Sequence, residues 1–116
     1  MNKREIGNIY EEKAADYIKS RGLEVVERNF NCRFGEIDII ALDTNRKVIF
    51  FYEVKYRKNN RFGTPFEAVD QRKQNRIILT SKYYLINNKK YSDYKVCYSV
   101  IGFFGEELKY MDNVFS

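Results

Sequence analysis

Apolar and polar residues alternate along this chain with two different periods, and the change of period marks its elements. Apolar side chains recur every three or four residues between Asn2 and Gly22, which predicts a helix, and Asn2 with Glu5 is a helix-capping pattern. Three segments rich in Ile, Val, Phe and Tyr follow, which predicts strands over 23–30, 35–42 and 47–57. The polar residues 43–46 predict the turn between the last two strands.

The second half of the chain opens with a polar, glycine-containing loop at 59–63. Thr64, Pro65 and Glu67 then have the residue types of a capping box at the start of a helix. The mostly apolar stripe that follows predicts one continuous helix down to 87–88; its positions are Phe66, Val69, Lys73, Ile77, Thr80, Tyr84 and Leu85. Segments 94–104 and 108–111 predict two more strands on either side of a turn at Gly105.

This order of elements, helix, three strands, helix and two strands, predicts an α/β fold with a central mixed sheet flanked by helices. The chain has 116 residues and a mass of 13.9 kDa, the size of one domain, so residues 1–116 are expected to form a single domain. Its 44% hydrophobic residues are enough for a buried core, and its 32% charged residues fit a solvated surface.

Several sequence features predict a cytoplasmic protein with no membrane partner. The longest wholly apolar run, 48–52, is far too short to span a bilayer. The N-terminus leads into a charged helical segment rather than an apolar signal core. Only Cys32 and Cys97 are present, without the paired spacing of a zinc site, which is typical of a reducing compartment.

The chain contains no histidine, which excludes a Ser-His-Asp triad, a Cys-His pair and a His-ligated zinc site. Acid–base or metal chemistry must therefore come from carboxylates, lysines or tyrosines. The net charge of +5 fits a nucleic-acid partner, and it fits equally well a protein that is only kept soluble by its charge.

Charged residues interrupt the second and third predicted strands. Side chains alternate between faces, so Glu36 and Asp38 are expected to share a face, as are Glu53 and Lys55. A two-residue hairpin loop at 45–46 would place Asp38 opposite Glu53. A loop of odd length would separate them unless a bulge restored the register.

Two carboxylates at cross-strand distance repel each other and favour a divalent cation, and ligation by oxygen alone suits Mg²⁺ or Mn²⁺. A neighbouring Lys55 could orient or deprotonate a water, or neutralise charge on a phosphate oxygen. This combination is typical of phosphodiester hydrolysis. The alternative is a solvated polar face with ordinary cross-strand ion pairs. The apolar strands around the four charges favour the functional interpretation.

The segment Gly35-Glu36-Ile37-Asp38, followed by Glu53-Val54-Lys55, resembles the YraN family of small bacterial proteins. That family is placed in the PD-(D/E)xK nuclease-like superfamily, close in fold to archaeal Holliday-junction resolvases. The resemblance runs from about residue 3 to the C-terminus; further matching positions are Gly7, Glu11, Ala14, Arg28, Asn29, Arg57, Gly63, Ala68, Val69 and Lys73. It implies a restriction-endonuclease-like fold and a metal-dependent endodeoxyribonuclease.

The same resemblance assigns roles to individual residues. Asp38 and Glu53 match the two acids of the motif, Lys55 matches its lysine, and Glu11 matches the acid that many members add to the metal site. The implied ligands of Mg²⁺ or Mn²⁺ are thus Asp38, Glu53 and Glu11. Glu11 also lies where an ordinary surface charge would lie, beside the apolar stripe of its helix. Glu36 is either a supporting residue or, by its alternation, a residue that faces the metal.

The chain departs from the family pattern in two places. Tyr10 stands where a glycine is usual before the helix acid, and a ring there could crowd the approach to Glu11. Cys97 to Val100 stands where an Arg-Phe-Asp-Val type of segment is common, which puts any role of that strand in doubt. Neither departure changes Asp38, Glu53 or Lys55.

Basic residues near the motif are candidates for contacts with nucleic acid, with DNA favoured over RNA; they are Arg57, Lys58, Arg61, Arg72, Lys73 and Arg76. The alternative is a solvated helix face and loop. Lys73 falls on the inward stripe of its helix, where a lysine needs a partner.

Three functions therefore stay open: a nuclease acting on branched or damaged DNA, a non-catalytic nucleic-acid-binding module, and an interaction protein without a nucleic-acid role. Symmetric cleavage of a junction would need a homodimer, and no segment identifies a dimer surface.

Overall fold

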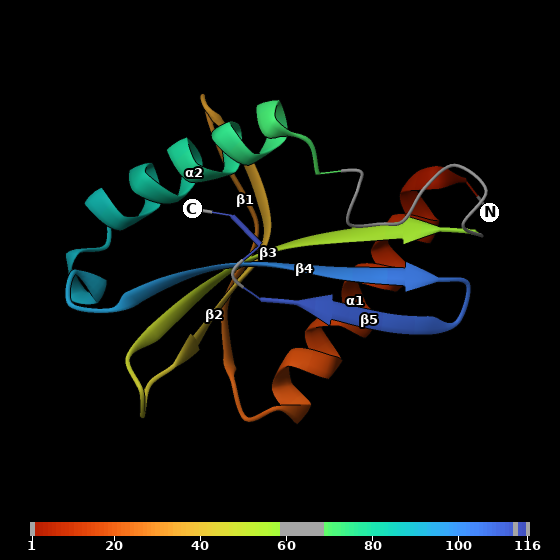
Figure 1. Ribbon diagram of the computed structural model, residues 1–116, viewed down its shortest axis with the longest axis horizontal. Coiled ribbons are helices and arrows are strands. Elements are labelled where there is room, and N and C mark those ends of the chain that lie inside the picture. Colours follow the sequence, from red (N-terminus) through yellow and green to blue (C-terminus); the bar gives the residue numbers. More distant parts are fainter. Residues whose placement is uncertain (1, 59–68, 113, 116) are drawn as a thin grey trace.

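The computed structural model describes residues 2–58, 69–112 and 114–115. In chain order, its elements are α1 (Lys3–Ser20), β1 (Glu24–Cys32), β2 (Gly35–Asp43), β3 (Val48–Arg57), α2 (Gln71–Ile86), the short 3-10 helix η2 (Lys89–Tyr91), β4 (Lys95–Phe104) and β5 (Glu107–Met111) (Figure 1). The strands form one sheet in the order β1-β2-β3-β4-β5, in which β3 and β4 are parallel and the other neighbours antiparallel. This confirms the predicted mixed α/β fold, and the arrangement is consistent with a restriction-endonuclease-like fold.

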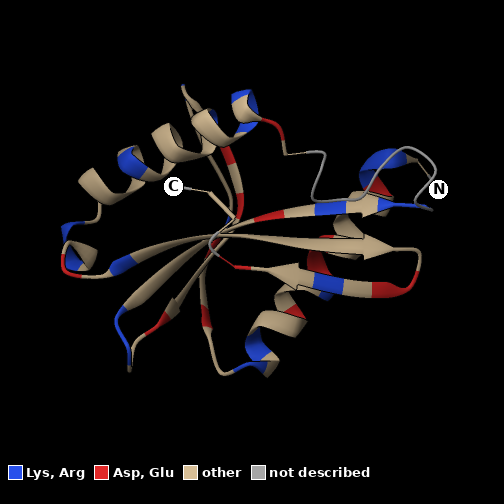
Figure 2. Cartoon of the chain, in the orientation of Figure 1, with Lys and Arg blue, Asp and Glu red and all other residues tan. Residues whose placement is uncertain are grey.

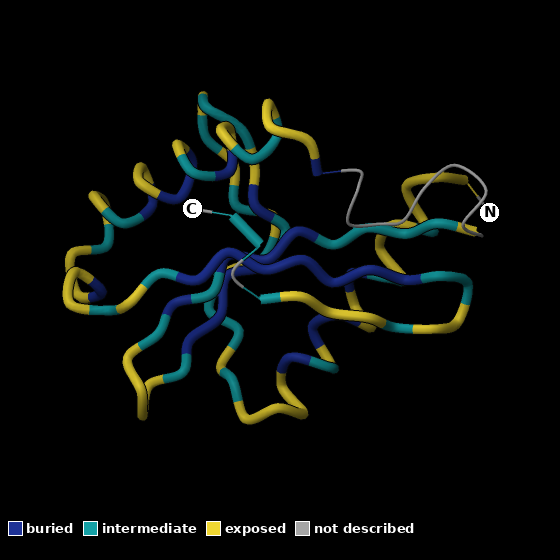
Figure 3. Tube along the Cα trace, in the orientation of Figure 1, coloured by how far each residue is buried: buried dark blue, intermediate teal, exposed yellow. Residues whose placement is uncertain are grey.

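The two long helices cover opposite faces of the sheet. Ala14, Ala15 and Ile18 of α1 are buried in a core with Tyr52 and Ile101 of the central strands. On the other face α2 contributes Ile77 and Tyr84 to a second core; its strand members include Ile40, Phe51 and Val100. Figure 3 shows the buried positions concentrated along β3 and β4. Since these strands are covered on both faces, they are apolar almost throughout rather than alternating.

The N-terminal helix begins where the sequence predicts. Asn2 has extended backbone, and its side chain accepts a hydrogen bond of 2.9 Å from the backbone N–H of Glu5. This bond satisfies one of the amides that a helix leaves unpaired in its first turn.

The second helix begins later than the sequence predicts. Val69 and Asp70 are not helical, so the prediction of one continuous helix from Thr64 to Asn87 is wrong. The helix cap is Asp70, which has extended backbone and accepts a hydrogen bond of 2.9 Å from the backbone N–H of Lys73. An aspartate is as good a helix cap as the threonine that the prediction chose. The predicted loop at 59–63 and capping box at 64–67 lie outside the described residues.

The register of the β2–β3 hairpin is the one expected from a two-residue loop. Pairing runs from Asp43 opposite Val48 to Ile39 opposite Tyr52, so Asp38 and Glu53 occupy the next positions along the two strands. Beyond this point the strands separate. β2 continues beside β1 as far as Gly35, whereas β3 continues beside β4 as far as Arg57, and Figure 1 shows the two directions. Asp38 therefore lies where the sheet divides.

Strict alternation along β2 breaks at the same place. Ile37 belongs to the core under α2, whereas Ile39, two residues later, belongs to the core under α1. The facing position in β1 is Asn29, which has a φ of 53° and interrupts the pairing between Arg28–Ile39 and Phe30–Ile37. A simple two-residue period therefore cannot describe this part of β2, because both of its neighbours depart from regular pairing here.

Candidate functional site

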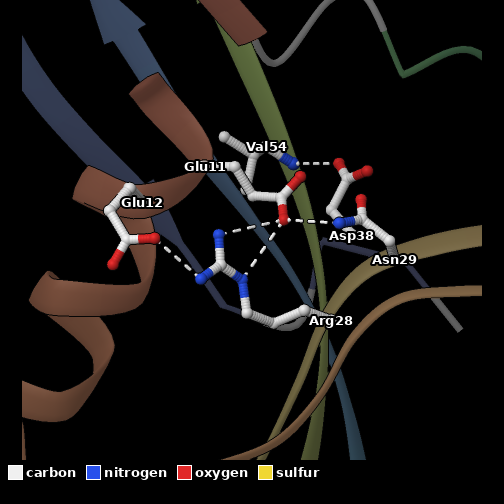
Figure 4. A network of polar contacts seen from close by, with 6 residues as sticks. All are labelled: Glu11, Glu12, Arg28, Asn29, Asp38 and Val54. Atoms are coloured by element: carbon white, nitrogen blue, oxygen red, sulfur yellow. Dashed lines mark hydrogen bonds and ion pairs between the residues drawn. The ribbon is translucent and has the colours of Figure 1, made fainter. Parts of the chain in front are cut away.

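Asp38 is a half-buried carboxylate held against the neighbouring strand. Its Oδ2 atom accepts a hydrogen bond of 2.8 Å from the backbone N–H of Val54 (Figure 4). Burial raises the pKa of Asp38 to about 7, and the negative charge of Glu53 adds to this effect. Glu11 and Glu36 act in the same direction. Four acidic side chains from three elements thus interact at the division of the sheet.

Glu53 lies on the α2 side of β3 and is paired with two lysines. Only 5% of its side chain is exposed, and its Oε1 atom lies 3.1 Å from Lys55 Nζ and 2.8 Å from Lys73 Nζ. Lys73 comes from the first turn of α2, and this ion pair is the reason for a lysine on the inward stripe. The structure therefore places Lys73 inside the site rather than on the open helix surface.

The two lysines have pKa shifts of opposite sign. Burial lowers the pKa of Lys55, and the nearby positive charge of Lys73 lowers it further, against the attraction of Glu53. Burial also opposes the charge of Lys73, but the ion pair and hydrogen bond with Glu53 outweigh it, and the pKa of Lys73 is raised. Lys55 is consequently the lysine that gives up its proton more readily.

Glu11 is held by two residues of β1, from the opposite side of the site. Its Oε1 atom accepts hydrogen bonds from Arg28 Nε at 3.3 Å, Arg28 Nη2 at 3.2 Å and Asn29 Nδ2 at 2.9 Å (Figure 4). Arg28 Nη1 also lies 2.8 Å from Glu12 Oε2. Glu11 is only 9% exposed, so the structure does not support its alternative interpretation as an ordinary surface charge.

Arg28 and Asn29 match the family pattern, but the sequence by itself assigned them no role. The signal that could have found them is a run of three polar residues, 27–29, in the middle of an otherwise strand-like segment. The left-handed backbone of Asn29, which turns its amide toward Glu11, has no signature of its own in the sequence, although asparagine tolerates that conformation better than most residues.

A cavity of about 220 Å³ lies in front of three of the acids. Its lining comes from α1 and the first three strands and consists of Gly7, Asn8, Tyr10, Glu11, Asn29, Glu36, Asp38, Val54 and Tyr56. Glu36 and Asp38 thus line the same space, as expected from their shared face. Glu53, Lys55 and Lys73 lie behind it, on the α2 side of β3.

The donor set fits a hard divalent cation, although the ligand cage is not preformed. Within residues 2–58, 69–112 and 114–115, no three acidic or sulfur ligands already converge in a metal-binding geometry. Each described contact of the three acids nevertheless uses a single oxygen: Oε1 of Glu11, Oδ2 of Asp38 and Oε1 of Glu53. The second oxygen of each could complete a Mg²⁺ or Mn²⁺ site, and such a cation would relieve the repulsion that, after burial, raises the pKa of Asp38.

The remaining predicted basic residues are distributed around this site. Arg72 and Arg76 are exposed and lie one turn apart near the start of α2, and Lys58 is exposed at the end of β3 (Figure 2). Arg57 is half-buried, and its Nη1 donates to the carbonyl oxygen of Tyr56 at 3.0 Å. Arg61 lies outside the described residues. Contact of these side chains with nucleic acid stays a prediction.

The two departures from the family pattern have different structural settings. Tyr10 stacks on Tyr56, with ring centroids 4.2 Å apart and planes at 16°, and both rings line the acidic cavity. On β4, Ser99 is buried and donates a hydrogen bond of 2.7 Å to Asp112. Cys97 beside it is a buried free thiol. Only the first departure therefore reaches the candidate site.

Comparison with known proteins identifies the family. The model of an uncharacterised protein family, UPF0102, matches residues 10–103. The chain belongs to the UPF0102 family. The match includes Glu11, Asp38, Glu53 and Lys55, and it confirms the family expected from the sequence, since YraN and UPF0102 are one family.

Relatives of the UPF0102 chain match over most of their length. A UPF0102 protein of Fusobacterium nucleatum is 46% identical over 114 residues, covering 98% of this chain and 93% of the relative. One from Lachnoclostridium phytofermentans is 40% identical over 115 residues, covering 99% and 96%. One from Caldicellulosiruptor saccharolyticus is 45% identical over 89 residues, covering 77% and 74%.

None of the helices in the described part of the UPF0102 chain is long and apolar enough to cross a membrane.

Proposed function

We propose that this protein is a Mg²⁺- or Mn²⁺-dependent endonuclease of the PD-(D/E)xK type that hydrolyses phosphodiester bonds in DNA. The observation that carries the proposal is the setting of Asp38: a half-buried carboxylate at the division of the sheet, whose pKa is raised to about 7 by desolvation first and by the nearby acids of α1 and β3 in addition. Such a cluster is electrostatically unfavourable by itself. A divalent cation and a substrate phosphate together would neutralise it.

In this proposal Asp38 and Glu53 hold the cation, and Glu11 joins them through the oxygen that does not contact Arg28 and Asn29. The bound cation would supply Lewis-acid chemistry and a more acidic water. Lys55, whose pKa is lowered by burial, either neutralises charge on the phosphate or, when deprotonated, accepts a proton from the attacking water. Lys73 stays protonated and holds Glu53 in place.

The proposed substrate is branched or damaged DNA, by the likeness of the motif to archaeal Holliday-junction resolvases. The observed mixed sheet flanked by two helices supports this assignment at the level of fold. Fold does not determine activity, so the reaction must be tested on the protein itself. Symmetric cleavage of a junction would in addition require a homodimer.

One observation favours a second candidate, a non-catalytic nucleic-acid-binding module on the same fold. Lys55 and Lys73 already neutralise Glu53 without any metal ion, and the described acidic residues do not form a preformed metal site. In that case the charged residues of β3 would maintain the packing of α2 on the sheet. Salt-sensitive DNA binding without metal-dependent cleavage would select this candidate.

Calorimetry with Mn²⁺ tests the proposal directly, followed by cleavage assays on duplex, single-stranded and four-way-junction DNA. The wild type is expected to bind Mn²⁺ and to cleave at least one substrate, and Asp38→Asn is expected to lose both. Asp93→Asn is the matched control, because it removes an exposed carboxylate that pairs with Lys47. Wild-type cleavage by folded Asp38→Asn would overturn the proposal. The Mn²⁺ titrations are repeated with DNA bound, so that a metal site completed by a substrate phosphate is also detected.

A further inference from the structure

A second cavity adjoins the acidic one. It has a volume of about 430 Å³ and is lined by Lys3, Ile6 and Gly7 of α1 and by Tyr56 and Arg57 of β3. Gly7 and Tyr56 also line the acidic cavity, so the two spaces meet at these residues. A ligand longer than one phosphate group can therefore reach from the acids into the second cavity.

The aromatic wall between the cavities is supported from behind. Tyr10 stacks on Tyr56 at a centroid distance of 4.2 Å, and Tyr10 in turn packs on the buried Phe103 at 4.9 Å. Lys13 Nζ lies 5.2 Å from the centroid of the Tyr10 ring. Since Tyr10 is held by these neighbours, it fixes the ring plane of Tyr56, and Tyr56 is the aromatic residue that lines both cavities.

The other residues of the second cavity suit a nucleotide. Ile6 and the Tyr56 ring provide apolar surface, and Lys3 and Arg57 provide positive charge next to it. The hydrogen bond of 3.0 Å from Arg57 Nη1 to the Tyr56 carbonyl oxygen holds the guanidinium against the backbone of β3. A flat apolar base and a charged phosphate require this combination, in which stacking on an aromatic residue accompanies cationic contacts to the backbone.

Gly7 keeps the junction between the cavities open. A Cβ atom built at this position would meet no heavy atom of the described residues within 4 Å, so none of them fills the space beside it. Any larger side chain at position 7 would project into the junction without displacing packed atoms.

We propose that the second cavity binds an unpaired DNA base stacked on Tyr56, while the phosphate next to that base enters the acidic cavity. A paired base has both faces covered by its neighbours in the duplex, so the site selects single-stranded or unstacked DNA. Stacking does not depend on base identity, and the binding is therefore sequence-tolerant. The inference rests on the proposed function, since it assigns the substrate strand of the same site.

Fluorescence anisotropy with a labelled oligothymidylate of about 12 nucleotides at low salt, with Ca²⁺ present to offset the charge of the acidic cavity, measures this contact. The wild type is expected to bind the oligothymidylate more tightly than a duplex of equal length. Tyr56→Leu is expected to weaken binding by about 5- to 100-fold, the usual range for losing one stacked base. Tyr56→Phe keeps the ring and is expected to stay within about 2-fold of the wild type.

Gly7→Leu is a second test variant, and it leaves the Tyr56 side chain unaltered. Leucine favours a helix more than glycine does, so the fold is expected to persist, and circular dichroism checks it. The added side chain is expected to block the junction and to weaken oligothymidylate binding, and Gly7→Ala to do so less. Because the two leucine variants alter different elements, a folding failure of one leaves the other as a test.

Near-wild-type affinity in a folded leucine variant would overturn the inference, as would equal affinity of the wild type for duplex DNA. Tighter binding of oligouridylate would overturn its assignment to DNA. The two proposals fail separately. DNA binding that depends on Tyr56, without cleavage by the wild type, would overturn only the proposed nuclease activity. Metal-dependent cleavage of duplex DNA that is unaffected by Tyr56→Leu would overturn only the stacking site.

Discussion

At the scale of single residues, the site is defined by charged side chains that the fold removes from water or holds close to other charges. Asp38 lies half-buried near other acids, whereas one oxygen of Glu53 has two lysine partners. The two acids occupy neighbouring strands at facing positions, yet only one of them has cationic partners among the described contacts. Ionisation of Asp38 is therefore costly for the folded protein.

Removing the charge of Asp38 is therefore expected to stabilise the metal-free protein in a pH-dependent way. The pKa of Asp38 is raised from 3.8 to about 7, so the folded state binds the proton more tightly than the unfolded state. The contribution of Asp38 to stability is greatest below the lower value, declines as pH rises through this window and is lost above about 7. Asp38→Asn should escape this decline and exceed the wild type by more than about 1 kcal/mol near pH 8.

Thermal unfolding in EDTA, followed by circular dichroism between about pH 4 and pH 8, measures this difference. The stability advantage of Asp38→Asn over the wild type should grow as pH increases. Adding Mn²⁺ should reduce this advantage by stabilising the wild type. A wild type that is more stable than Asp38→Asn near pH 8 without metal would contradict the prediction.

Glu53→Gln is expected to act in the opposite direction. Without the carboxylate, Lys55 and Lys73 stay close together without their counter-charge, and the free energy of unfolding should fall by about 2 kcal/mol, less than for a fully buried pair because both lysines are partly exposed. Urea denaturation measures the loss. Adding Lys73→Met to Glu53→Gln should recover part of it; a double variant less stable than the single one would contradict this explanation.

At the scale of elements, each part of the site depends on an irregular place in a helix or strand. Acidic residues gather where β2 and β3 stop pairing, Glu11 is held where Asn29 interrupts β1, and Lys73 follows the cap of α2. Regular elements satisfy their own backbone groups. Where a helix or strand is interrupted, side chains from several elements come together at one place.

The cap of α2 gives a prediction at this scale. Asp70→Ala removes the acceptor for the Lys73 amide and should lower the free energy of unfolding by about 1 kcal/mol, whereas Asp70→Ser should cost much less because serine also caps helices. Urea denaturation of the two variants provides the comparison. Equal stability of Asp70→Ala and the wild type would contradict the prediction that the Asp70 side chain stabilises α2 as its cap.

At the scale of the whole molecule, positive charge is unevenly placed around the site. Arg72 and Arg76 are exposed near the start of α2, which also supplies Lys73 to the site, whereas Lys89 and Lys90 lie in η2 beyond the other end of this helix (Figure 2). The net charge of +5 attracts a polyanion from any direction. Only charges near the acidic cavity are placed to contact a bound phosphate backbone.

Salt dependence of DNA binding separates these two groups. Replacing Arg72 and Arg76 together by Gln should reduce the slope of log K against log salt by about two, because each phosphate contact contributes roughly one. Replacing Lys89 and Lys90 by Gln removes the same charge and should change the slope much less. Equal slopes for both double variants would show that binding follows net charge alone.

The sequence by itself determined the order of the elements, the mixed sheet and the register of the β2–β3 hairpin, whose last pair lies next to Asp38 and Glu53. These features depend on local spacing and on the length of one turn, which are legible along the chain. Even locally, the capping pattern predicted a helix start at Thr64, whereas the structure places the cap of α2 at Asp70.

Only the tertiary structure decided how the charged residues meet. Arg28 and Asn29 reach Glu11 from 17 and 18 positions away, and Lys73 reaches Glu53 from another layer. The raised pKa of Asp38 comes from burial, and the two cavities come from surfaces of α1 and β3. Desolvation and contact between distant residues are properties of packed neighbours, and no local pattern in the sequence encodes them.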